Sequence, residues 1–173
     1  LEEMANRRAA VGLMLRPPTS KEQAIFHREL GDSVLHFPFA LGGIAVLAGN
    51  ESGIDSLEVS DLRALLGGEA GGGIDRVYAP DPNQGLWDAF LSGIGVEGDT
   101  ADSSRVVFLA DEAAVLQAVV ADPRGVGIAS TLSLPDTLGE TGARTLAIRG
   151  DDRPAAAQPE YEAIGYGEYP LYH

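Results

Sequence analysis

Residues 78–91, YAPDPNQGLWDAFL, combine a turn with the start of a helix in a pattern that suits anion binding. Two prolines lead to Asn83, Gln84 and Gly85, and an amphipathic run begins at Leu86. The first N–H groups of a helix lack internal partners and lie at the positive end of its dipole, and a glycine lets a ligand approach them closely. We expect these four residues to bind a small oxyanion or polar ligand through backbone N–H groups and the Gln84 amide.

A structural interpretation of the same turn stays open. Asn83 would cap the helix, Gly85 would avoid a clash, and the polar side chains would be solvated. Trp87 falls on the apolar face of the expected helix together with Phe90 and Leu91. We therefore predict that Trp87 belongs to the hydrophobic core and does not line a cleft.

Arg16 is the second candidate for ligand binding. It follows residues 11–15, an expected buried strand, and open α/β sheets bind ligands at the carboxyl ends of their strands. Its guanidinium offers a bidentate fork that suits carboxylate or phosphate. A solvated or salt-bridged Arg16 is an equally simple interpretation, because the chain carries 26 acidic residues.

The residue types give little support for catalysis or metal binding. There is no cysteine, and His27, His36 and His173 do not form a pair with the i, i+4 spacing of a helical metal site. A Gly-x-Ser-x-Gly nucleophile motif is also missing from the sequence. We predict that the chain is not an enzyme and has no catalytic residue, no metal and no cofactor.

Composition excludes two classes of partner. The 173 residues carry a formal net charge of −14, which argues against a nucleic-acid surface or an anionic-membrane surface. No apolar run is long enough to span a membrane. The chain begins at Leu1 without a recognisable signal peptide, so any targeting signal would lie upstream.

Alternating strands and helices must position these candidates. A Thr19-x-x-Glu22 capping box predicts one helix, and further helices are expected at residues 57–66, from Leu86 onward and after Asp111. Apolar runs predict strands at residues 11–15, 44–48, 76–78, 106–109, 126–129 and 145–148. This alternation indicates an α/β fold with largely parallel sheets.

Five motifs, in this order, resemble the phosphate-type solute-binding proteins of ABC importers. They are GLMLRPPTSKEQAIF, the pair FPFALGGIAVLAGN and SLEVSDLRALLGGE, the ligand turn QGLWDAF, the return segment AVVADPRGVGIAS, and the tail YPLYH. The resemblance implies a two-lobed periplasmic-binding-protein-like fold with a two-strand hinge. One lobe would contain residues 1–40 and 130–173, and the other would contain residues 41–129.

The resemblance also implies a function. The chain would capture a small anion such as phosphate in the cleft between the lobes and deliver it to an ABC transporter permease or a membrane sensor. Its location would be periplasmic, extracellular or on the cell surface. Arg16 would supply positive charge, and Asn83, Gln84, Gly85 and Leu86 would supply the donors of the ligand turn.

The sequence departs from the family at the ligand turn. Gln84, Leu86 and Pro80 stand where the family has Ser, Thr and Arg. We expect the family's N-terminal strand and its own ligand loop to lie before Leu1, so that either the chain is incomplete or the module has lost one wall of its cleft. These departures favour an alternative, a ligand-free interaction or structural module that keeps the fold. If one lobe lacks a central strand, a homodimer would cover the exposed sheet edge.

Overall fold

The computed structural model describes residues 4, 6, 8, 11, 12, 14, 18–31, 34, 35, 40–69, 73–97 and 103–172. The chain divides into two compact units, Leu1–Ala40 and Leu41–His173. The second unit contains every strand among the described residues. The expected grouping of residues 130–173 with residues 1–40 in one lobe stays a prediction.

The first unit contains helix α2, Ser20–Leu30. Its predicted capping box is confirmed: the Thr19 hydroxyl accepts from the Glu22 N–H at 3.3 Å, and the Glu22 carboxylate accepts from the Thr19 N–H at 2.7 Å. Each bond satisfies an N–H that lacks an intrahelical partner, so the sequence determines where α2 begins.

The predicted strand at residues 11–15 is wrong at the positions that are described. Val11, Gly12 and Met14 are not in a strand, and Val11 is 78% exposed. A strand needs a hydrogen-bonded neighbour, and the described part of the first unit contains no other strand. The strand expected to present Arg16 is therefore absent at these positions, and Arg16 itself lies outside the described residues.

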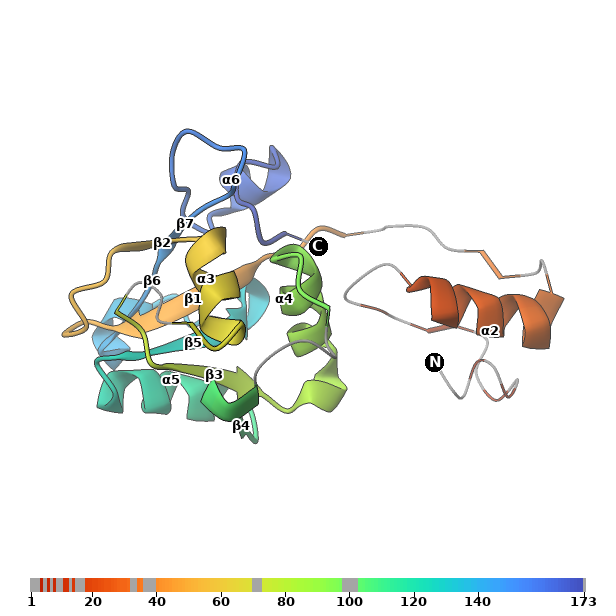
Figure 1. Ribbon diagram of the computed structural model, residues 1–173, viewed down its shortest axis with the longest axis horizontal. Coiled ribbons are helices and arrows are strands. Elements are labelled where there is room, and N and C mark those ends of the chain that lie inside the picture. Colours follow the sequence, from red (N-terminus) through yellow and green to blue (C-terminus); the bar gives the residue numbers. More distant parts are fainter. Residues whose placement is uncertain are drawn as a thin grey trace. The chain divides into compact units, whose positions relative to one another are not determined.

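The second unit is built on a five-stranded sheet in the order β4-β3-β5-β1-β6 (Figure 1). Its strands are β1 (Ile44–Gly49), β3 (Arg76–Pro80), β4 (Val106–Leu109), β5 (Gly125–Ser130) and β6 (Ala143–Thr145). β3 pairs in parallel with β4 and β5, whereas β1 runs antiparallel to β5 and β6. A two-stranded parallel sheet joins β2 (Ser56–Glu58) to β7 (Ala147–Arg149). Parallel pairs thus predominate among the described strands, and the predicted α/β class is confirmed.

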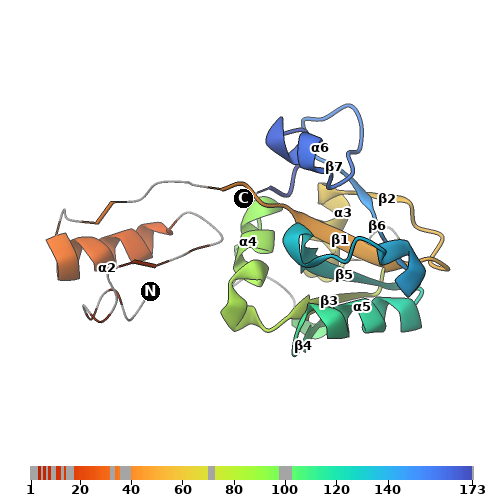
Figure 2. The same cartoon turned by 180° about the vertical axis from the view of Figure 1, so that it is seen from behind.

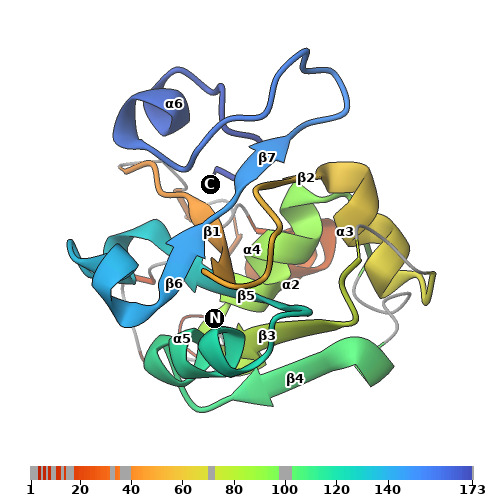
Figure 3. The same cartoon turned by 90° about the vertical axis from the view of Figure 1, so that its left-hand side faces the viewer.

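The two faces of the large sheet bury two separate hydrophobic clusters. Along β1, Ile44 and Val46 contribute to one cluster, and Ala45 and Leu47 contribute to the other, as the period of two requires. Helices α3 (Val59–Leu66) and α4 (Leu86–Gly93) supply the first cluster, and α5 (Glu112–Ala121) supplies the second. The helices therefore cover opposite faces of the sheet (Figure 3).

Glycines allow α5 to lie close to the sheet. A Cβ atom on Gly127 would come within 2.5 Å of Val115 and 2.8 Å of Val119, and one on Gly49 would come within 2.6 Å of the Val119 carbonyl oxygen. Val115 and Val119 are fully buried there. Val120, the next residue along α5, is 46% exposed.

Two expected elements are divided differently in the structure. Residues 57–66 do not form one helix, because Ser56–Glu58 pairs with β7 as β2 and α3 begins only at Val59. Residues 145–148 do not form one strand, because the chain passes there from β6 to β7 and so from one sheet to the other. Figure 2 shows β7 and the short helix α6 (Tyr161–Gly165) on the side of the unit away from β4.

Candidate functional site

The predicted ligand turn lies at the carboxyl end of β3. Asp81 begins the 3-10 helix η2 (Pro82–Gln84), Gly85 follows, and α4 starts at Leu86. The end of β4 lies alongside, because Pro80 pairs with Leu109. Residues 81–86, called the Gly85 turn below, thus occupy the sheet edge where α/β folds bind ligands.

Asp81 takes up two of the donors that the sequence offers at this turn. Its Oδ1 atom accepts from the Asn83 N–H at 2.9 Å and from the Asn83 side-chain amide at 2.8 Å. Asn83 therefore does not cap α4, contrary to the structural interpretation of the sequence. The signal for Asp81 is present in the sequence, because an Asp two residues before a turn amide is typical of an Asx turn.

Gly85 is the N-cap residue of α4 and has a φ of 80° and a ψ of −10°. A Cβ atom there would meet no atom within 4 Å, so the backbone angle and not a clash favours glycine. The Gly85 N–H donates to the Pro82 carbonyl at 3.3 Å, which leaves the Leu86 and Trp87 N–H groups as the next donors along the chain.

The side chains that follow Gly85 belong to the core. Leu86 is 2% exposed and Trp87 is 8% exposed, and the Trp87 ring lies edge-on to Phe108 with a centroid distance of 5.3 Å. The predicted core position of Trp87 is confirmed. Leu86 can therefore contribute only its backbone N–H to a ligand, which is the role predicted for it.

The charged side chains that follow β3 and β4 at this edge of the sheet are acidic. Asp81 and Asp88 are the only charged residues between positions 78 and 91. After β4, Asp111 accepts from the Ala114 N–H at 2.8 Å and Glu112 accepts from the Ser130 N–H at 2.8 Å. Any anion held at the Gly85 turn therefore needs a cation from another part of the chain.

The side chains of two predicted ligand residues, Arg16 and Gln84, lie outside the described part of the structure. Arg16 lies outside the described residues, and the Gln84 backbone is described within η2 without its side chain. Their ligand contacts stay predictions.

Two cavities lined by described residues, of about 450 Å³ and 340 Å³, do not include the Gly85 turn. In the first, a hydrogen bond to Tyr78 raises the pKa of the Arg76 guanidinium above its ordinary value. In the second, Arg63 donates to the Ile94 carbonyl at 2.7 Å and forms an ion pair with Asp151. Arg76 and Arg63, one cation from each cavity, thus have internal partners.

The described residues contain neither a metal-binding cluster nor a membrane-spanning helix. No group of three or more His, Cys, Asp or Glu side chains in this part of the chain could hold a metal ion. Among the same residues, no helix combines the length and apolar character needed to cross a membrane.

No protein-family model matches the chain, and no curated protein matches it by sequence. Solved structures do match: an ABC-type phosphate transport receptor from Vibrio cholerae has a TM-score of 0.74 at 16% identity over 99% of this chain. A possible phosphate binding protein from Planctomyces limnophilus gives 0.70 at 17% over 99%, and PstS from Borrelia burgdorferi gives 0.63 at 14% over 99%.

The chain spans 67%, 64% and 68% of those three proteins, respectively. Because the sequence identity to these proteins is only 14–17%, the comparison shows a shared fold alone. The chain therefore has the α/β fold of phosphate-type solute-binding proteins, as the sequence motifs predicted.

Proposed function

We propose that the chain is a solute-binding domain that captures a small anion, a phosphate-like oxyanion, for ABC-type uptake or for sensing. The observation that carries this proposal is the Gly85 turn, which starts α4 at the carboxyl end of β3 within a fold shared with phosphate transport receptors. The partners would be an ABC transporter permease or a membrane sensor. The chain would act in the periplasm, outside the cell or on its surface.

The binding mechanism follows from the donors that remain at the turn. The Leu86 and Trp87 N–H groups lie at the positive end of the α4 dipole and would donate hydrogen bonds to the anion. Arg16 would provide the compensating charge through a bidentate contact. Gln84 would add its amide in place of the hydroxyl that the family has at this position. Closure of a hinge around the ligand would exclude water and strengthen these contacts.

The charge at the turn favours a second candidate, a ligand-free interaction or structural module. Asp81 accepts hydrogen bonds from the Asn83 N–H and from the Asn83 side-chain amide. Residues 78–91 include two acidic and no basic residues. A phosphate dianion would lose several charge-assisted hydrogen bonds relative to the family site, each worth about 1.5–3 kcal/mol. A module of this kind would keep the fold and bind no anion.

A thermal-shift titration separates the two candidates. The 173-residue chain would be titrated with phosphate, sulfate, molybdate, phosphonates and small carboxylates. A binder gains about 2.7 kcal/mol at a hundredfold excess over Kd, which raises Tm by about 5–10 °C for a chain of this size.

A matched pair of variants identifies the source of positive charge. Arg16→Ala should abolish the shift, whereas Arg28→Ala should leave it intact, because Arg28 lies on α2 and pairs with Glu29 at 2.7 Å. A saturable shift that both variants retain would reject Arg16 as a ligand residue. No shift with any anion would reject the binding proposal in favour of the module.

A further inference from the structure

Two chain segments connect the five-stranded sheet to the two-stranded sheet. β1 continues through residues 49–55 into β2, and β6 continues into β7, so both segments pass to the two-stranded sheet. Two backbone hydrogen bonds flank residues 51–54 of the first segment. The Asn50 N–H donates to the Gly142 carbonyl at 2.8 Å, and the Ala147 N–H donates to the Asp55 carbonyl at 3.2 Å. Within this segment, the Gly49 carbonyl accepts from the Ser52 N–H at 3.0 Å, whereas the donors to the Asn50 and Ile54 carbonyls come from outside it.

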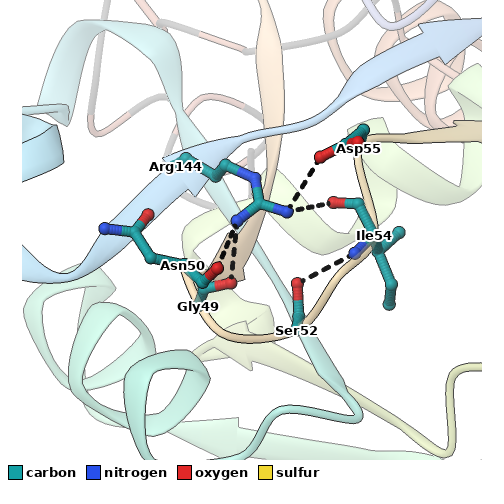
Figure 4. Close-up of polar contacts among 6 residues, drawn as sticks. All are labelled: Gly49, Asn50, Ser52, Ile54, Asp55 and Arg144. Atoms are coloured by element: carbon teal, nitrogen blue, oxygen red, sulfur yellow. Dashed lines mark hydrogen bonds and ion pairs between the residues drawn. The ribbon is translucent and has the colours of Figure 1, made fainter.

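The Arg144 side chain on β6 supplies those donors (Figure 4). Its Nη1 donates to the carbonyl oxygens of Asn50 at 2.8 Å and Gly49 at 3.3 Å. Its Nη2 donates to the Ile54 carbonyl at 2.7 Å and to the Asp55 carboxylate at 3.1 Å. Four oxygen atoms from one loop thus converge on a single guanidinium group.

The carbonyl contacts should matter more than the ion pair. The Asp55 side chain is 92% exposed, so solvent weakens its attraction to Arg144. The Arg144 side chain is only 28% exposed, and its bonds to neutral carbonyls are charge-assisted. Removing Asp55 should therefore change the loop far less than removing Arg144.

Arginine is the residue type that fits this position. Its planar fork carries donors on two nitrogen atoms, which reach Asn50 on one side of the loop and Ile54 on the other. A lysine ammonium is a single point donor and cannot serve both sides in the same way.

We propose that Arg144 is an internal cation that organises residues 49–55, called the Arg144 loop below, and thereby joins the two sheets. The loop is a cation-binding loop whose cation belongs to the chain itself. In the absence of the Arg144 side chain, a free guanidinium ion should occupy the same position. Chemical rescue of this kind would distinguish a cation site from general side-chain packing.

Hydrogen exchange of the full chain tests the proposal. In Arg144→Ala, the amides of Asn50 and Ala147 should exchange about tenfold faster, because local opening no longer breaks charge-assisted bonds. Guanidinium ion at low millimolar concentration, far below unfolding conditions, should restore protection, whereas sodium chloride at equal ionic strength should not. Arg144→Lys should give intermediate protection, and it provides the test if Arg144→Ala does not fold.

Two variants serve as matched controls. Asp55→Asn should retain most of the protection at Asn50 and Ala147. Arg124→Ala, which removes a different exposed ion pair with Asp75, should leave these amides unchanged. Unchanged exchange in Arg144→Ala or Arg144→Lys, equal rescue by sodium chloride, or an equal loss in Asp55→Asn would each overturn the proposal.

Discussion

The Gly85 turn and the Arg144 loop both follow strands of the same sheet, but they use their backbone polar groups in opposite ways. In the Arg144 loop, the carbonyls of Gly49, Asn50 and Ile54 all accept from one side chain of the chain itself. The Gly85 turn instead opens into the first N–H groups of α4, which lack intrahelical acceptors. Polar groups satisfied internally stabilise a fold, whereas groups left open are available to a ligand.

The largest effect is expected at another backbone carbonyl that a side chain satisfies, that of Ile44. Tyr169 is fully buried, and its hydroxyl donates to the Ile44 carbonyl at 2.7 Å. Tyr169→Phe leaves that carbonyl unpaired and should lower the free energy of unfolding by about 1–3 kcal/mol. Urea unfolding at neutral pH measures this loss, and a stability equal to the wild type would contradict a structural role for such bonds.

The same hydroxyl predicts an alkaline pH dependence. Burial raises the pKa of Tyr169 above its ordinary value, so this stabilising term is complete below the unfolded pKa of about 10. As the pH rises above that value, the unfolded chain releases the proton first, and stability should fall by about 1.4 kcal/mol per pH unit. Tyr169→Phe should lose this contribution to the slope; equal slopes in both proteins would refute the assignment.

A matched pair of glycines compares the two regions directly. Gly85 has a φ of 80° and Gly53, in the Arg144 loop, has a φ of 69°, and neither has an atom within 4 Å of a Cβ position. Gly85→Ala and Gly53→Ala should each cost about 1–2 kcal/mol through backbone strain. Only Gly85→Ala should also weaken phosphate binding, which calorimetry would measure. Equal effects of both variants on phosphate binding would contradict the assignment of the anion site to the Gly85 turn and not to the Arg144 loop.

The smallest effect on stability is expected for Asp81→Asn. The new amide keeps an oxygen acceptor for the Asn83 N–H but removes a negative charge from the Gly85 turn. Anion affinity should increase about fivefold, since a nearby unit charge contributes about 1 kcal/mol through water. Asp55→Asn is the control and should leave affinity unchanged. An unchanged or weaker affinity in Asp81→Asn would argue that no anion approaches this turn.

Features that depend on neighbouring residues could be predicted from the sequence. The Thr19–Glu22 capping box and the Asp111 cap of α5 act over three residues, and both are found in the structure. The buried strands at residues 44–48 and 126–129 follow from continuous apolar runs. The core position of Trp87 follows from helical periodicity.

Features that depend on distant partners could not be predicted in this way. The acceptors of Arg144 lie 89 to 95 residues away along the chain, so no local pattern indicates them. The apolar run at residues 11–15 predicted a strand, but its described members Val11, Gly12 and Met14 are not in one. Asp81 is the opposite case, because its two acceptor contacts are local and its Asx-turn pattern is visible in the sequence.

The most direct test of the distinction between the two regions is a phosphate titration of the ¹⁵N-labelled chain followed by NMR. We predict saturable shifts of the Leu86 and Trp87 amide signals, while the amides of the Arg144 loop stay unchanged. Saturation at Leu86 and Trp87 would identify the Gly85 turn as the anion site. Signals at these two amides that do not move, or that move no more than those of residues 49–55, would contradict it.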